Sequence, residues 1–205
     1  VCSSDLKVYV VDFDMKQADV MMIAKGDVFN PEMTAGVSMY NEYFGGGMSS
    51  IVFQDLRESK ALAYSAYSVY SSPDKKGKEY VNYAFIGTQS DKLNEAMEGM
   101  TRLLKEMPTS SVQFNSAKAS ALQSMKTARI TKAGLLFDYE ASRKLGINSN
   151  YRPAILSKME SMEMKDVLNF QSQYIKNLKY TSLVVGKKAD LNKSILEKYG
   201  EVVYL

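Results

Sequence analysis

The sequence has 205 residues, of which 45% are hydrophobic and 24% are charged, and its formal net charge is +3 at pH 7. A chain of this length can bury the core of one domain. Its lysines and acidic residues are interspersed rather than gathered in one block, which argues against a nucleic-acid-binding surface.

Histidine is absent from the sequence. Histidine supplies most zinc ligands, most general bases near neutral pH and the central member of most nucleophilic triads. We therefore expect this chain to be inactive as a hydrolase when it acts alone. The single cysteine, Cys2, cannot form an internal disulfide, and no apolar run approaches the roughly 20 residues that cross a bilayer.

The first six residues, Val1 to Leu6, read VCSSDL, which is the translation of the end of a common sequencing adapter (GTG TGC TCT TCC GAT CT). We interpret residues 1–6 as a non-native leader. No proline-rich or glycine-serine linker and no repeat of fixed period interrupts the rest. We therefore expect residues 7–205 to form a single domain, and the chain to be a fragment of a longer protein.

Alternating and short apolar segments predict strands. These segments are Lys7 to Asp14, Asp19 to Lys25, Ala63 to Ser71, Glu79 to Gly87 and Tyr180 to Gly186. The stretch SPDKKGK between the third and fourth has the proline, aspartate and glycine of a hairpin turn, so these two strands are predicted to pair antiparallel. The chain closes with an apolar tail, Val202 to Leu205.

Apolar residues at helical spacing predict helices between these strands. Asn30, Pro31 and Glu32 are predicted to begin the first, as N-cap, first helical position and first-turn acid, and Gly45 is predicted to end it. Ser49 or Ser50 is predicted to cap a second, which ends near Ser59. The later predicted helices are Ser90 to Met107, Ser111 to about Arg129, Thr131 to Leu145, Pro153 to Lys158, Glu163 to Lys176 and Leu191 to Tyr199.

The order of these elements predicts an α+β fold. Strands occur in pairs separated by helices, which favours a mainly antiparallel sheet with helices packed on one face. The glycines Gly45 to Gly47 lack the preceding strand and the following Lys-Ser/Thr of a phosphate-binding loop. We interpret them as a helix stop in left-handed geometry that lets two helices meet at a sharp angle.

Taken alone, Arg57 and Tyr64 have ordinary interpretations. Arg57 lies off the apolar stripe near the C-terminal end of a predicted helix, where a surface cation is favourable. Tyr64 lies at the start of a predicted strand, and alternation puts it on the same face as Ala66, Ser68 and Tyr70, where its ring would pack on the sheet.

The stretch FGGGMSSIVFQDLRESKALAYS, residues 44–65, resembles the pitrilysin/insulinase family of zinc metallopeptidases, the inverzincins. It is similar to the C-terminal, non-catalytic half of those chains, where a glycine-rich break precedes a helix that reads L-F-x-x-L-R-E and then G-L-A-Y-S. Ala61 stands where glycine is common in that pattern. The resemblance extends over nearly the whole chain and implies an insulinase-type (LuxS/processing-peptidase-like) domain.

The resemblance implies specific roles. In that family a peptide lies between two halves of a clamshell, one of which carries zinc and the general base on H-x-x-E-H. The other supplies an arginine and a tyrosine seven positions apart, a spacing that Arg57 and Tyr64 have. The resemblance implies that Tyr64 hydrogen-bonds the carbonyl oxygen as it becomes an oxyanion, while Arg57 holds a neighbouring substrate carbonyl.

The motif H-x-x-E-H is absent, so we expect no cofactor in this chain and a zinc ion in a partner half, in the same chain or in a separate subunit. The predicted function is the non-zinc half of a zinc metalloendopeptidase that closes over peptides. The alternatives are a non-catalytic scaffold or partner subunit of the same family, and an unrelated α+β binding domain. A bacterial origin is expected, with the periplasm and the cytoplasm both left open.

Overall fold

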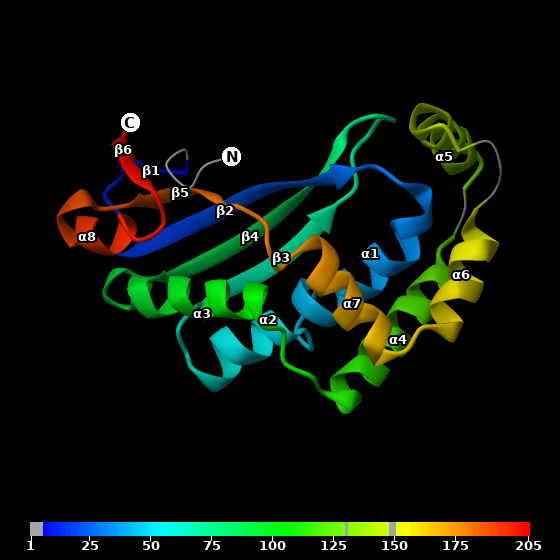
Figure 1. The fold of residues 1–205 in the computed structure, drawn as a ribbon, viewed down its shortest axis with the longest axis horizontal. Helices are drawn as coiled ribbons and strands as arrows, with labels where there is room; N and C mark the ends of the chain where they lie inside the picture. Colours follow the sequence, from blue (N-terminus) through cyan, green and yellow to red (C-terminus); the bar gives the residue numbers. More distant parts are fainter. Residues whose placement is uncertain (1–5, 130, 148–150) are drawn as a thin grey trace.

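Six strands form one mixed sheet in the computed structural model, which describes residues 6–129, 131–147 and 151–205 (Figure 1). The strand order across the sheet is β3-β4-β2-β5-β1-β6. The strands are β1 (Lys7–Asp12), β2 (Gln17–Val28), β3 (Ser65–Ser71), β4 (Glu79–Gln89), β5 (Thr181–Gly186) and β6 (Glu201–Tyr204). Of the interpreted leader Val1 to Leu6, residues 1–5 lie outside the described residues.

Antiparallel pairing dominates the sheet, as predicted. Strand β2 pairs antiparallel with β4 and β5, and β3 pairs antiparallel with β4, which confirms the predicted hairpin. Strand β1 is parallel to both β5 and β6. The sequence did not predict β6 as a strand, because four residues are too few to show alternation; its pairing with β1, in which Val202 lies opposite Val8, is a tertiary contact.

The helices are α1 (Thr34–Tyr40), α2 (Ile51–Phe53), α3 (Leu93–Lys105), α4 (Ser111–Thr127), α5 (Lys132–Leu145), α6 (Arg152–Ser161), α7 (Met164–Tyr174) and α8 (Lys193–Leu196). Two π-helical segments follow directly on α1 and α2, namely Asn41–Gly45 and Gln54–Ser59. The sequence predicted one regular helix at each place. Compared with the predictions, α6 is longer and α8 is shorter.

One face of the sheet carries the helices. Along β2, Val20, Met22 and Ala24 are buried, whereas the alternating residues Met21 and Ile23 remain partly exposed. The exposed alternates are still apolar, and the register joins Met21 to Phe85 on β4 and to Leu183 on β5. The predicted α+β fold with helices on one face is therefore confirmed.

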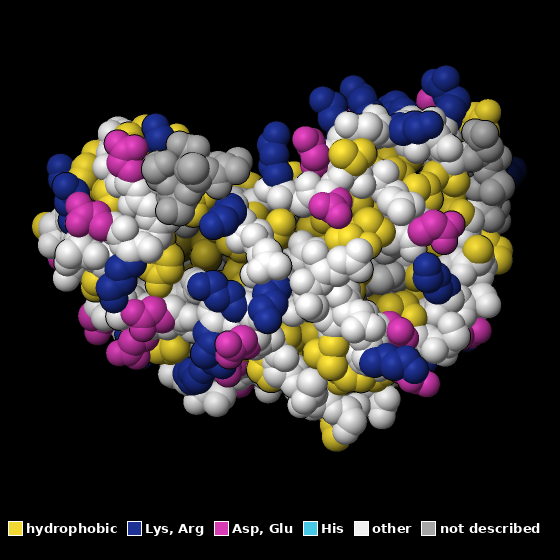
Figure 2. All heavy atoms as spheres, viewed as in Figure 1, with side chains coloured by type: hydrophobic (Ala, Val, Ile, Leu, Met, Phe, Trp, Pro, Cys, Tyr) yellow, Lys and Arg dark blue, Asp and Glu magenta, His cyan; other side chains and the backbone are white. Residues whose placement is uncertain are grey.

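Figure 2 shows basic and acidic side chains spread over the viewed surface.

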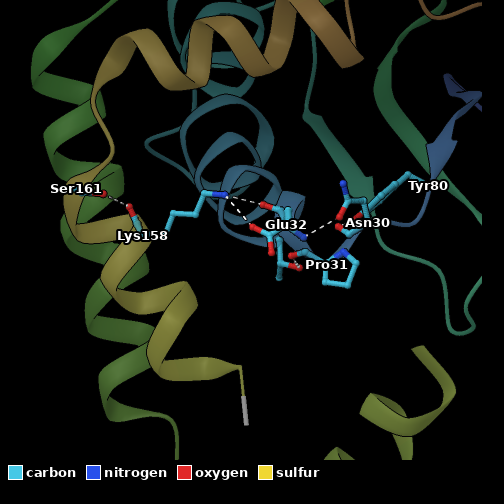
Figure 3. Close-up of polar contacts among 7 residues, drawn as sticks. Asn30, Pro31, Glu32, Tyr80, Lys158 and Ser161 are labelled. Carbon is cyan, nitrogen blue, oxygen red and sulfur yellow. Dashed lines mark hydrogen bonds and ion pairs between the residues drawn. The ribbon is translucent and has the colours of Figure 1, made fainter. Parts of the chain in front are cut away.

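The start of the first helix follows the predicted capping pattern (Figure 3). The side chain of Asn30 accepts a hydrogen bond from the Glu32 backbone N–H at 3.0 Å, and Pro31 occupies the first helical position. The segment begins as a 3₁₀ turn, Pro31–Met33, before α1. Lys158 of α6 donates to the Glu32 carbonyl at 2.9 Å, and the Tyr80 hydroxyl donates to the Asn30 carbonyl at 3.1 Å. The cap thus ties the helix to both α6 and β4.

The glycine triplet serves two different purposes. Gly45 ends the π-helical segment, as predicted, but its essential feature is the absence of a side chain: a Cβ there would overlap the Ser68 carbonyl of β3. Gly47 has φ +91 with nothing within 4 Å of a built Cβ, so left-handed geometry is its only requirement. The sequence interpretation, which assigned left-handed geometry to the helix stop itself, holds for Gly47 only.

We expect Gly45→Ala to lower the free energy of unfolding by about 2 kcal/mol or more, because helix and strand backbones must separate to admit the methyl group. Gly47→Ala should cost only about 1 kcal/mol, from its φ alone. Urea unfolding followed by circular dichroism measures both. Equal costs for the two variants would contradict a close backbone contact at Gly45.

Buried tyrosines make the fold sensitive to alkaline pH. The Tyr70 side chain is fully buried, its ring stacks on Tyr80 at a centroid distance of 4.9 Å, and desolvation raises the pKa of its hydroxyl to about 12. A tyrosine in an unfolded chain has a pKa of about 10. From about pH 10 upward the unfolded chain therefore loses this proton while the folded chain retains it, so stability falls as pH rises.

We expect the free energy of unfolding to be nearly constant from about pH 8 to 9.5 and to decline between about pH 10 and 12. Tyr70→Phe should show a shallower decline, because one raised pKa has been removed. Urea unfolding at several pH values checks this. The same decline in both proteins would exclude Tyr70 as a contributor.

Candidate functional site

Arg57 lies on the second π-helical segment, immediately after α2. Ser50 caps α2, with its hydroxyl accepting from the Phe53 N–H at 3.4 Å, which selects Ser50 from the two predicted caps. Leu56 is fully buried, whereas the Arg57 side chain is 41% exposed. The predicted division between apolar stripe and surface arginine is therefore confirmed. The π geometry was missed, because its hydrogen-bonding pattern has no separate signature in the spacing of the apolar residues.

A tight turn at Ala61 leads from this segment to β3. Ala61 has φ +49, and its N–H donates to the Arg57 carbonyl at 3.1 Å, while the Leu62 N–H donates to the Leu56 carbonyl at 2.8 Å. This is a helix C-terminus closed by a residue in left-handed geometry, a position that glycine usually fills. The family pattern has glycine at this position, and the turn does require left-handed backbone geometry there. Alanine adopts that geometry here at a cost in backbone strain.

Tyr64 lies just before β3 and faces solvent. Its N–H donates to the Gly87 carbonyl at 2.7 Å, so the ladder with β4 already holds its backbone. Its side chain is 70% exposed, while Ala63 before it is buried. The prediction that alternation places Tyr64 with the buried Ala66 and Tyr70 is therefore wrong. The chain bends at Tyr64, and the strand begins one residue later, at Ser65.

The structure brings the two predicted site residues together. The guanidinium carbon of Arg57 lies 5.3 Å from the centroid of the Tyr64 ring and 4.8 Å from that of Phe53. Both distances are within the range of cation–π attraction. Nε of Arg57 lies 3.7 Å from a carboxylate oxygen of Glu58, an ion pair whose partners are both largely exposed and therefore weakly coupled.

Several contacts that the sequence did not reveal hold this turn in place. Thr88 donates to the Leu62 carbonyl at 2.6 Å, and Lys92 donates to the Ala61 carbonyl at 3.1 Å. Asp55 accepts from Lys60 at 2.7 Å and from Arg102 of α3 at 2.9 Å. Lys60 is a local partner, whereas Thr88 of β4, Lys92 in the turn before α3 and Arg102 of α3 are distant in sequence, so no local pattern could identify them.

The arrangement presents hydrogen-bond donors on an open surface. A guanidinium has five N–H donors and a phenol has one O–H donor. In the described part of the chain the Tyr64 hydroxyl has no hydrogen-bond partner, so it is free to meet an acceptor from outside.

The molecule also has a pocket of about 310 Å³ lined by Glu98, Thr101, Arg102, Lys105, Glu106 and Tyr199, which includes neither Arg57 nor Tyr64.

These residues do not fit a zinc site. Within residues 6–129, 131–147 and 151–205, no group of three or more His, Cys, Asp or Glu side chains could hold a metal ion. Arg57 and Tyr64 offer a cationic and a phenolic group, the single carboxylate of Glu58 pairs with Arg57, and the sequence has no histidine. These side chains therefore provide no set of ligands for a metal ion. Among the same residues, no helix is both long and apolar enough to cross a membrane.

Residues 4–119, more than half of the chain, match the family described as the peptidase M16 inactive domain. The chain is 31% identical over 105 residues to the uncharacterized zinc protease YmxG of Bacillus subtilis, an alignment that covers 51% of this chain and 26% of that protein. It is also 37% identical over 65 residues to the uncharacterized zinc protease SCO5738 of Streptomyces coelicolor, covering 32% of this chain and 14% of that protein.

Solved structures show the same fold. The peptidase M16 inactive domain from Pseudomonas fluorescens superposes with a TM-score of 0.73 at 16% identity, covering 91% of this chain and 44% of that one. The periplasmic protease PqqL from Escherichia coli gives a TM-score of 0.65 at 18% identity, covering 90% of this chain and 21% of that one.

The chain therefore belongs to the M16 peptidase family, as an inactive, C-terminal domain. This confirms the resemblance to the pitrilysin/insulinase metallopeptidases and the assignment to their non-catalytic half. The chain spans less than half the length of the relatives described above.

The strained turn at Ala61 gives a direct test of the local geometry. Ala61→Gly should leave the free energy of unfolding unchanged within about 0.5 kcal/mol or raise it, because relief of left-handed strain offsets the added freedom of the unfolded chain. The control Ala63→Gly, at a buried position without positive φ, should lose about 1 kcal/mol. Urea unfolding compares them, and a larger loss at position 61 than at 63 would contradict the turn geometry.

Proposed function

We propose that this chain is the half of an M16 zinc protease that closes over peptide substrates and contributes Arg57 and Tyr64 to substrate and oxyanion binding. The zinc ion and general base belong, in this proposal, to an H-x-x-E-H-bearing half, in the same chain or in a separate subunit. The observation that carries the proposal is the juxtaposition of the Arg57 guanidinium and the Tyr64 ring at 5.3 Å.

The geometry supports this use of the pair. Arg57 lies on a helical segment and Tyr64 lies seven residues later, at the head of a strand. The two side chains meet because the turn at Ala61 folds the chain back. The bend at Tyr64 then points the phenol outward. A tyrosine that packed in the core would point inward instead. An exposed phenol without a partner and an exposed guanidinium are suited to bind a group supplied from outside the domain.

Peptide cleavage provides such a group. As a nucleophile adds to the scissile carbonyl, negative charge develops on its oxygen, and a hydrogen bond from the Tyr64 hydroxyl strengthens at that moment. The Arg57 guanidinium is always protonated and can hold a neighbouring substrate carbonyl through one or two N–H groups. This chain thus supplies binding and charge stabilisation, while the bond-breaking chemistry lies elsewhere.

Substitutions in the complete protease test the proposal. Tyr64→Phe removes one oxyanion donor and should lower kcat for a fluorogenic peptide by about 10²- to 10³-fold. Arg57→Ala should lower kcat/KM for the same peptide, with a rise in KM, because it removes substrate binding. Initial rates over a range of peptide concentrations separate the two effects.

Matched controls are available on α5. Tyr139→Phe and Arg143→Ala change the same residue types in another part of the fold; Tyr139 is about as exposed as Tyr64, and Arg143 is more exposed than Arg57. Both should leave turnover unchanged. Unchanged turnover in Tyr64→Phe and in Arg57→Ala would overturn the proposal and favour the non-catalytic scaffold or partner subunit.

A further inference from the structure

We propose that Phe53 is a positioning residue that holds the Arg57 guanidinium beside Tyr64 while leaving its N–H groups available. This proposal rests on the proposed function of Arg57 and Tyr64. The starting observation is that the guanidinium carbon lies closer to the Phe53 centroid, at 4.8 Å, than to that of Tyr64, at 5.3 Å. The arginine is therefore attracted by two rings at once.

The helix places Phe53 and Arg57 correctly for this contact. They are four residues apart, so their side chains project from neighbouring positions on one helix surface. Phe53 is the last residue of α2, which the Ser50 hydroxyl anchors through the Phe53 N–H. Its ring is half-buried, and it therefore forms a fixed platform for a longer and more mobile side chain.

The kind of contact matters for the proposed function. A guanidinium stacked on a ring interacts through its face, and its five N–H donors lie in its plane. A strong salt bridge would instead occupy those donors. The nearest carboxylate, on Glu58, lies 3.7 Å from Nε, and both side chains are largely exposed, so this pair competes only weakly.

Loss of the ring should therefore release Arg57 rather than unfold the site. Without Phe53 the guanidinium can turn toward Glu58 or water, and a smaller fraction of molecules presents it beside Tyr64. A cation–π contact at an exposed site corresponds to a change of about two- to fivefold in a rate or binding constant. The expected loss is thus much smaller than that for removing Tyr64.

The test is a double-mutant cycle in the complete protease. Phe53→Leu should lower kcat/KM for a fluorogenic peptide about two- to fivefold, whereas Phe53→Tyr, which keeps an aromatic face, should retain it. In the Arg57→Ala background, Phe53→Leu should cause no further loss. Phe13→Leu, at a more exposed phenylalanine that directly follows β1, is a control for the same change of residue type and should have no effect.

A second measurement on this chain tests the contact without turnover. In ¹⁵N-edited NMR spectra the Arg57 side-chain Nε–H resonance should carry a ring-current shift that Phe53→Leu changes and Phe53→Tyr retains. Urea unfolding of each variant shows whether the fold is intact. A folded Phe53→Leu variant with an unchanged Arg57 resonance would overturn the proposal.

The outcomes separate the two proposals. Normal turnover in Arg57→Ala would refute the role that the proposed function gives to Arg57, and with it the purpose assigned to Phe53. A second outcome is reduced turnover in Arg57→Ala and a Phe53→Leu loss that is as large in that background as in the background with Arg57. This outcome would refute only the positioning role of Phe53, because Phe53 would then act by packing or by touching substrate directly. A loss confined to the background that contains Arg57 supports the proposal.

Discussion

The contact between Gly45 and the edge strand β3 is the constraint on which the geometry of the candidate site depends. A Cβ at Gly45 would overlap the Ser68 carbonyl, so helix and strand meet backbone to backbone. Beside this contact, the Asn41 side chain accepts from the Tyr70 N–H at 2.8 Å and donates to the Tyr70 carbonyl at 3.1 Å. A side-chain amide thereby occupies edge groups that a further strand would otherwise pair with.

This anchoring fixes both segments that carry the site. The chain leaves Gly45, turns at Gly47 and begins α2 at once, so α2 and Arg57 are set relative to β3. Tyr64 stands at the head of that same strand, and its own N–H is bound to β4. Backbone contacts in this corner of the molecule therefore set the backbone positions of Arg57 and Tyr64 relative to each other, which is the kind of support that preorganised donors require.

The sequence predicted the fold class, the hairpin and most helices, because these depend on local periodicity and capping residues. Asn30, Pro31 and Glu32 begin a helix in the structure as their order predicts, and Gly146 ends α5 with φ +75. The seven-residue spacing of Arg57 and Tyr64 was visible as well. What the spacing alone did not establish was that the two side chains meet, since this required the turn at Ala61.

The failures of prediction have a common cause in non-local geometry. Alternation assigned Tyr64 to the buried face, but the bend before β3 breaks the period of two at that residue. The hydrogen bonds that Thr88 and Lys92 donate to the turn arise from tertiary packing. The exposure of Tyr64 also bears on mechanism. In water a single hydrogen bond contributes little, and it strengthens when the surrounding dielectric falls. Under the proposed function, the donors of this domain become effective only when a facing half excludes solvent. Exposed side chains of Arg57 and Tyr64 are therefore what this function requires of the domain before the two halves close.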